Sequence, residues 1–223
     1  ATGNELNMNL KILSLVIIGV CILLPDVCYA FLSKDVHLLN MQNGLADNTV
    51  SAVYKDKEGF VWFGTRNGLS RYDGRRITNF ERSRSYPSIS NLKEVFDGVL
   101  AFVDNGVFSA FDLKKERFLS VVSSSGQGIP SRGMLQRNDS LVWVISGSEL
   151  HLMKRCASKE GELRLRVQEK YTGWNNQDNL LVAITYSSDK KSICLIDEKG
   201  RIILLDATNL NSFRVIDLGR IGS

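Results

Sequence analysis

Arginine is the residue type with the clearest local concentration in this chain. Six arginines fall within nineteen residues: Arg66, Arg71, Arg75, Arg76, Arg82 and Arg84. A guanidinium group pairs bidentately with carboxylate and sulfate-like groups, so this cluster could recognise an acidic or sulfated ligand. The alternative is a solvated surface on which the side chains alternate in direction along strands, and the sequence favours that alternative.

Residues suited to acid–base or metal chemistry are sparse. The chain has two histidines, His37 and His151, and its carboxylates are scattered. An enzyme needs such groups to converge, and the sequence has no CxxC motif and no cluster of His, Cys and carboxylates. We therefore expect no catalytic residues, no metal site and no cofactor. Cys156 and Cys194 are expected to remain separate thiols.

Residues 1–30 have the pattern of an N-terminal extension followed by a secretory signal peptide. Lys11 precedes an uncharged apolar run at residues 12–24, and a cleavage position follows Ala30. A helix of these thirteen residues rises only about 20 Å, less than the roughly 30 Å of a bilayer core. We therefore expect export to the periplasm, with an uncleaved anchor as the alternative. The formal net charge of +4 permits an acidic ligand, but nucleic acid is not an expected partner of an exported domain.

Residues 43–80 are typical of four short strands joined by tight turns. Apolar and polar side chains alternate over residues 50–54, as in a half-buried strand. Residues 57–59 end on a glycine that can form a turn, and Asn67-Gly68 is a strong hairpin signal. The stretch therefore predicts a four-stranded antiparallel meander.

This pattern recurs in weaker form three more times. Equivalent second-strand positions fall near Trp62, Leu100, Trp143 and Cys194, at separations of 38, 43 and 51 residues. A period of about 40–50 residues with several strands per unit indicates a β-propeller. A β-sandwich is the competing all-β fold, but it gives no reason for whole units to recur. We expect Trp62 and Trp143 to fill the space between neighbouring blades.

We therefore predict an all-β fold of β-propeller-type repeats, with about four four-stranded antiparallel blades that form part of a larger, seven-bladed propeller. The partial propeller is expected at residues 31–223. Its blades are expected at about residues 41–80, 91–122, 133–171 and 180–218. An extra strand is expected at residues 36–39. Because the fourth repeat has its own outer strand, the extra strand has no partner within the chain, which favours a fragment of a longer protein.

The most specific motif of the chain lies in residues 43–74. Its elements are, in order, Gly44-Leu45, Asp56, Gly59, Trp62, Gly64-Thr65, Gly68-Leu69 and Arg71-Tyr72-Asp73-Gly74. In these positions the sequence resembles the two-component regulator propeller repeat, and the other three repeats have lost most of them. With a signal peptide ahead of the first blade, the chain looks like the N-terminal periplasmic sensor region of a hybrid two-component histidine kinase from a Bacteroidetes-type bacterium.

The resemblance implies a function and a set of partners. It implies a non-catalytic domain that detects oligosaccharides released from complex glycans on behalf of a sensor histidine kinase. The expected partners are an oligosaccharide ligand and the remaining blades and sensor domains of the parent protein, with a homodimer as a further expectation. The kinase and the inner-membrane anchor would belong to the C-terminal part of that parent.

Ligand-binding candidates follow from propeller topology. Loops between blades and turns between the second and third strands open on one face, around the central channel. The candidates on that face are Asn48, Arg66, Asn67, Arg84, Tyr86, Asp104, Trp174 and Asn176. Trp174 stands in a polar loop, where an indole could stack on a sugar ring, although packing against an adjacent blade is favoured.

Two other classes of function stay open. A propeller enzyme, such as a lyase or hydrolase, would need convergent catalytic groups near the channel. A purely structural propeller would serve dimerisation or docking through its blade faces. Oligosaccharide binding without turnover would separate a sensing domain from both.

Overall fold

The computed structural model describes residues 37–81, 89–174 and 179–217, and the described residues from Leu39 onward belong to one compact unit. The signal peptide expected at residues 1–30 lies outside the described residues. The described part folds into sixteen strands and one short 3₁₀ helix, η1 (Met41–Asn43). No helix in these ranges is long and apolar enough to cross a membrane.

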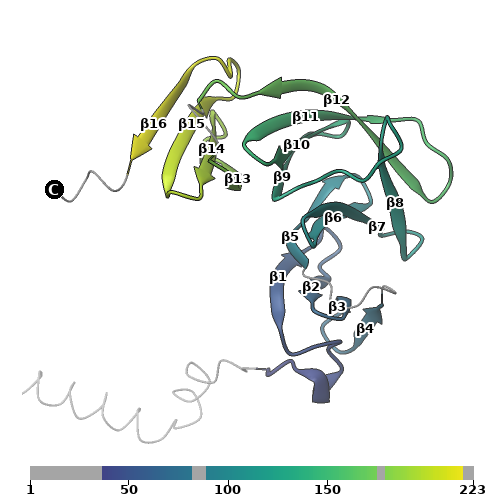
Figure 1. The fold of residues 1–223 in the computed structure, drawn as a ribbon. Coiled ribbons are helices and arrows are strands. Elements are labelled where there is room, and N and C mark those ends of the chain that lie inside the picture. The colour runs from purple at the N-terminus through teal and green to yellow at the C-terminus, as the bar shows by residue number, and fades with distance from the viewer. Residues whose placement is uncertain (1–36, 82–88, 175–178, 218–223) are drawn as a thin grey trace, which may run out of the picture. The chain divides into compact units, whose positions relative to one another are not determined.

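The strands form four consecutive four-stranded units, blades 1 to 4 (Figure 1). Blade 1 contains β1 (Val50–Lys55), β2 (Val61–Thr65), β3 (Gly68–Tyr72) and β4 (Ile77–Phe80). Blade 2 contains β5 (Ile89–Phe96), β6 (Val99–Asp104), β7 (Val107–Asp112) and β8 (Arg117–Ser123). Blade 3 contains β9 (Gly133–Asn138), β10 (Leu141–Ser146), β11 (Glu149–Cys156) and β12 (Glu162–Tyr171). Blade 4 contains β13 (Leu181–Tyr186), β14 (Ser192–Asp197), β15 (Arg201–Asp206) and β16 (Phe213–Asp217).

Within each blade the strands pair antiparallel and in chain order. In blade 1 the predicted hairpin forms, with Thr65 paired to Gly68. The prediction of an all-β fold built from four-stranded antiparallel repeats is confirmed.

The extra strand expected at residues 36–39 is not seen in the residues that the structure describes. Residues 37–39 contain no strand. The chain turns directly after them, where the Asn40 side chain caps η1 and accepts a hydrogen bond from the Asn43 backbone N–H at 3.1 Å.

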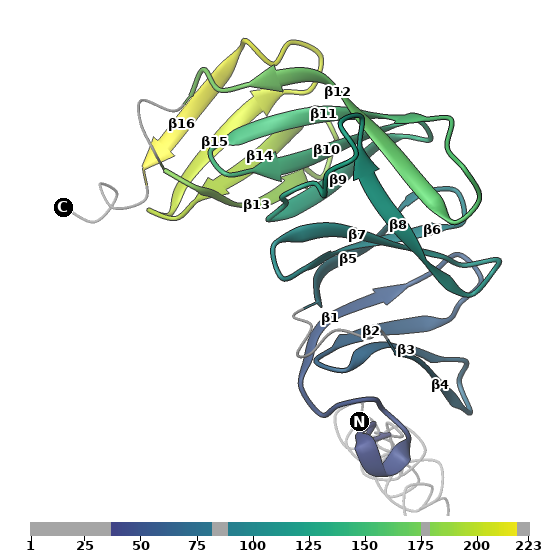
Figure 2. The ribbon, with the colours of Figure 1, turned by 45° about the vertical axis from the view of Figure 1, so that its right-hand side comes forward.

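Blades 2 and 3 are joined into a single eight-stranded sheet. Their outer strands β8 and β12 pair in parallel, from Ser120 beside Glu162 to Ser123 beside Leu165 (Figure 2). Nothing in the repeat pattern predicts this pairing, since each outer strand was expected to close its own blade.

Three hydrophobic clusters lie at the blade junctions. Trp62 packs with Leu100 and Phe111 between blades 1 and 2, and Trp143 packs with Ile193 between blades 3 and 4. The third cluster joins blades 2 and 3. Both tryptophans are almost completely buried, so their expected role between neighbouring blades is confirmed.

Two glycines of the motif are required by close approaches in blade 1. A Cβ on Gly64 would lie 2.5 Å from Cγ2 of Ile89 in blade 2. Gly68 has φ +116°, and a Cβ there would lie 2.4 Å from the Phe80 carbonyl oxygen. The first glycine therefore permits blade 2 to pack closely, and the second permits the turn into β3.

Candidate functional site

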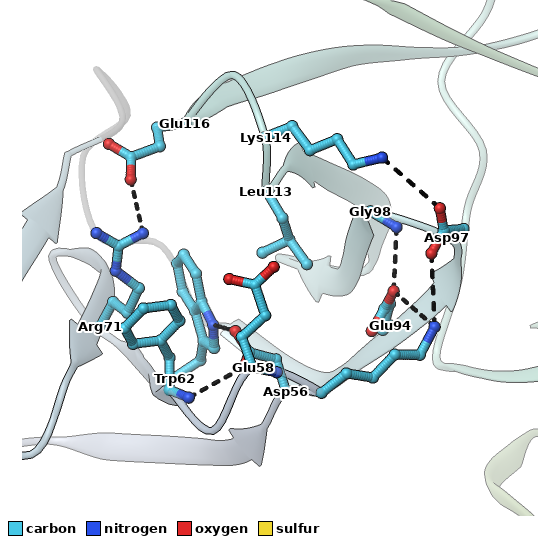
Figure 3. Close-up of a pocket in the computed structure, with 12 residues that line it drawn as sticks. Asp56, Glu58, Trp62, Arg71, Glu94, Asp97, Gly98, Leu113, Lys114 and Glu116 are labelled. Atoms are coloured by element: carbon cyan, nitrogen blue, oxygen red, sulfur yellow. Dashed lines mark hydrogen bonds and ion pairs between the residues drawn. The ribbon is translucent and has the colours of Figure 1, made fainter.

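The candidate site is a hollow between blades 1 and 2, called here the blade 1–2 hollow. Its volume is about 480 Å³. Its walls come from the β1–β2 turn and the end of β3 in blade 1, and from the β5–β6 and β7–β8 turns in blade 2 (Figure 3). Tight turns from two blades therefore bring charged side chains to one place.

Asp56 builds the inner wall of the hollow. One carboxylate oxygen, Oδ1, accepts hydrogen bonds from the backbone N–H groups of Glu58 and Phe60 at 3.0 and 2.9 Å. The other oxygen, Oδ2, accepts from the indole Nε1 of Trp62 at 2.8 Å. A single carboxylate thus fixes the β1–β2 turn and satisfies a buried donor of the core.

Arg71 spans the two blades at the opposite side of the hollow. Its Nη1 lies 2.6 Å from Oε1 of Glu116, in the β7–β8 turn. The guanidinium also stands 4.8 Å from the ring centre of Phe60 and 5.6 Å from that of Trp62. Arg71 therefore combines an ion pair to blade 2 with cation–π contacts inside blade 1.

A second group of ion pairs closes the blade 2 side. Lys57 Nζ lies 3.3 Å from Glu94 Oε1 and 3.6 Å from Asp97 Oδ1, and Lys114 Nζ lies 3.8 Å from Asp97 Oδ2. Glu94 is nearly buried and also accepts from the Gly98 backbone N–H at 3.0 Å. The hydrogen bond from Lys57 to Glu94 raises the pKa of that lysine.

These contacts decide what the hollow can do chemically. Glu58 is the lining carboxylate whose side chain makes no ion pair or hydrogen bond with any described residue, and it is exposed. Asp56 is occupied by hydrogen bonds, and the remaining lining charges form ion pairs, of which those made by Lys57 and Arg71 cross the junction. No group of three His, Cys, Asp or Glu side chains in the described ranges is placed to hold a metal ion. The arrangement is therefore suited to fastening blade 1 to blade 2.

Three of the predicted ligand residues lie together at the other end of blade 1. Arg66 and Asn67 form the β2–β3 turn and are exposed. The Asn67 amide donates to the Ala46 carbonyl at 3.1 Å, which holds the turn against the loop that carries Asn48. Asn48 Oδ1 accepts from the Met41 backbone N–H at 2.8 Å. The Arg66 side chain is thus the exposed cation of this small polar surface.

Asp104 and Trp174 are placed differently from the expectation of channel-facing groups. Asp104 is fully buried at the end of β6 and accepts from Nδ2 of Asn105 at 3.2 Å. Its position corresponds to Thr65 of blade 1, the last residue of a second strand, so its side chain points into the sheet packing. Trp174 is 6% exposed and contacts Phe213 edge-on. The structure therefore agrees with the interpretation that Trp174 packs against an adjacent blade.

The remaining candidates Arg84, Tyr86 and Asn176 lie outside the described residues. Two described arginines of the cluster do not converge, because Arg71 is committed to the blade 1–2 hollow while Arg66 projects from the opposite end of the same blade. The bond from Asp56 to Trp62 was missed from the sequence. The sequence does contain a signal for this bond, because Asp56 precedes Trp62 by six residues and a glycine turn lies between them.

A scan of protein families matches residues 44–67 to the family described as "Two component regulator propeller". Residues 44–67 carry a two-component regulator propeller repeat. The matched segment contains Asp56, Trp62 and Gly64, which this structure places at the junction of blades 1 and 2. A comparison with curated protein sequences found no match.

Solved structures show the same fold as this repeat-bearing chain. The extracellular domain described as that of the hybrid two component system BT3049 from B. thetaiotaomicron is 17% identical, with a TM-score of 0.62, over 82% of this chain and 24% of that one. The extracellular domain described as that of the one component system BT4673 from the same organism is 15% identical, with a TM-score of 0.59, over 81% and 27%. The β-propeller domain of Cps50 (Swd1) from Myceliophteria thermophila is 16% identical, with a TM-score of 0.52, over 75% and 55%. The chain therefore spans about a quarter of the two bacterial domains that it resembles.

Proposed function

We propose that this chain is the opening part of the periplasmic sensing region of a hybrid two-component histidine kinase that responds to glycan-derived oligosaccharides. The observation that carries the proposal is the regulator propeller repeat at residues 44–67. Its structural resemblance to extracellular domains of B. thetaiotaomicron regulatory systems supports the same assignment. In this proposal the propeller binds its ligand and leaves it chemically unchanged.

The geometry of the blade 1–2 hollow does not favour a catalytic role. Two carboxylates that act as acid and base must both face a substrate. Here the Asp56 carboxylate is occupied by a turn and an indole, and the Glu116 carboxylate by Arg71. Within this hollow, Glu58 alone leaves a hydrolase or lyase mechanism without its second group.

A glycan array tests this function. The ectodomain that contains this chain is applied to immobilised oligosaccharides from plant, host and microbial glycans. We expect selective, saturable binding to one structural class. Absence of binding to every oligosaccharide, combined with a stable dimer in sedimentation, would instead support a purely structural propeller.

A further inference from the structure

The junction of blades 3 and 4 contains a counterpart of the blade 1–2 hollow. Two adjoining hollows of about 560 and 310 Å³ share Arg137 and Ala207 in their walls, and we call them the blade 3–4 cleft. The cleft is built from the end of β9 and from residues beside the β13–β14 and β15–β16 turns. Trp143 stands where Trp62 stands in the first hollow, in the second strand of its blade.

The two sites differ in what satisfies the tryptophan. Asn138 occupies the position of Asp56, and its Oδ1 accepts from the backbone N–H groups of Ser140 and Leu141 at 2.9 Å. No described atom accepts a hydrogen bond from Nε1 of Trp143, although that nitrogen is completely buried. A buried donor without an acceptor is unfavourable. A ligand atom that accepted a hydrogen bond from the Trp143 Nε1–H would remove this cost.

The cations of the cleft also lack the partners found in the first hollow. The Arg137 guanidinium stands 5.4 Å from the Trp143 ring centre and makes one long hydrogen bond, 3.4 Å to the Ala207 carbonyl. Within the described ranges, neither Arg137 nor Lys190 forms an ion pair. The lining carboxylate, Glu169, accepts instead from the hydroxyl of Tyr171.

The rest of the lining is suited to a saccharide. The half-buried rings of Tyr171 and Tyr186 present apolar surface beside a polar edge. Burial, followed by the contact with Glu169, raises the pKa of Tyr171 to about 12, so its phenol stays neutral. Side-chain amides that can donate to and accept from sugar hydroxyls complete the walls: Gln136, Asn138, Asn209 and Asn211.

We propose that the blade 3–4 cleft binds a uronic acid residue of an oligosaccharide, with the sugar carboxylate on Arg137 and Lys190. A planar guanidinium without a carboxylate partner is the group that binds a carboxylate bidentately. A sugar oxygen supplies the acceptor that Trp143 lacks, after the side chains over the indole adjust. This inference rests on the proposed sensing function and names the chemistry of its ligand.

Calorimetry on the full chain tests the charge requirement. The probes are trigalacturonate and a hyaluronan tetrasaccharide, each compared with its methyl-esterified form, which has the same backbone without the charge. We expect at least one acid to bind at least tenfold more tightly than its ester. Arg137→Met is expected to weaken that binding at least tenfold, whereas Arg75→Met, at an exposed arginine of blade 1, leaves it unchanged.

A second measurement reads out the indole directly. In a ¹H–¹⁵N spectrum, the side-chain signal of Trp143, assigned by its loss in Trp143→Phe, should shift on addition of the acidic probe. The signal of Trp62, whose donor is already bonded to Asp56, should stay in place. The proposed site would be overturned if the acid and its ester bound equally well, or if the two arginine variants had equal effects. Binding of a neutral glycan on the array would then leave the sensing function intact. Failure of every oligosaccharide to bind would overturn both.

Discussion

Trp62 and Trp143 occupy matching positions at two blade junctions, and one neighbouring residue decides whether the indole N–H has a hydrogen-bond acceptor. Both fill the space between neighbouring blades, but the acid at Asp56 satisfies the first indole and the amide at Asn138 does not satisfy the second. The first junction is closed by its own side chains, and the second is left with an unpaired donor.

Asp56→Asn should destabilise the chain. The amide can keep the two backbone hydrogen bonds through its oxygen, but its NH₂ group then faces the Trp62 indole donor. We expect the free energy of unfolding in urea to fall by about 1–3 kcal/mol, the cost of a buried unsatisfied donor.

Asp73→Asn is the matched control for that substitution. Asp73 also ends a strand, and its Oδ1 accepts from Arg75 and Arg76 backbone N–H groups at 2.8 and 2.6 Å, but it holds no indole. A loss as large for Asp73→Asn as for Asp56→Asn would show that the indole contact contributes nothing.

Gly64→Ala should separate blades 1 and 2. A Cβ at 2.5 Å from Ile89 forces a shift of a buried side chain, so we expect a loss of about 1–3 kcal/mol in the free energy of unfolding. Gly128→Ala is the control, since a Cβ there meets Val107 at an ordinary 3.6 Å. Similar urea midpoints for the two variants would contradict the close approach.

At the scale of elements, the parallel pairing of β8 with β12 makes blades 2 and 3 one sheet. Strands hydrogen-bonded on both edges open less readily than strands at a sheet edge. Hydrogen–deuterium exchange should therefore be slow in peptides covering β8 and β12. It should be faster in β4 and β16, the outer strands of blades 1 and 4, which end their sheets. Exchange in β8 as fast as in β4 would rule out the shared sheet in solution.

Ion pairs connect the same two blades through their outer turns. Glu160 Oε1 lies 2.8 Å from Lys115 Nζ and 2.9 Å from Arg117 Nη2. The hydrogen bond from Lys115, with the charge of that lysine and the contact with Arg117, lowers the pKa of Glu160. A carboxylate with a lowered folded-state pKa contributes stability above its unfolded pKa, near 4.3, and loses that contribution as the pH falls through the folded value.

Glu160→Gln should therefore lower the urea midpoint at pH 7 and should have no effect once the pH is below both pKa values. The effect is small, because all three side chains are substantially exposed. Glu58→Gln, at a carboxylate without a described partner, should leave the midpoint unchanged at both pH values. A deficit for Glu160→Gln that grows toward acid pH would contradict this sign.

The repeat pattern predicts the blades because each depends on local signals. Alternating side chains, the Asn67-Gly68 turn and a recurring second strand lie within about forty residues of one another. The β8–β12 pairing could not be predicted in this way, since it joins edges 42 residues apart through main-chain bonds that carry no side-chain signature.

The candidate site was harder to predict than the fold. Propeller topology places the Asn67 turn and the loop at Ala46 on the same face, and the two are in contact. It does not predict the direction in which a single side chain points. Asp104 sits one residue before its turn, where the alternation of the strand directs it inward. Trp174 stands among polar neighbours in the sequence, and its indole packs beside Phe213 of the following blade, in agreement with the favoured interpretation.

At the scale of the whole molecule, the central claim is that this propeller binds an oligosaccharide and leaves it intact. The chain corresponds to about a quarter of the bacterial extracellular domains that share its fold. The decisive sample is therefore the ectodomain that contains it. Binding and turnover have to be read from the same sample, because a sensor and an enzyme both bind sugar.

The most direct test is a calorimetric titration of that ectodomain with the oligosaccharide selected on the array, followed by chromatography of the recovered sugar. The account predicts a saturable binding isotherm and a sugar recovered at its original length after prolonged incubation. Shortened or unsaturated products, lost on replacing a carboxylate of the propeller, would contradict it.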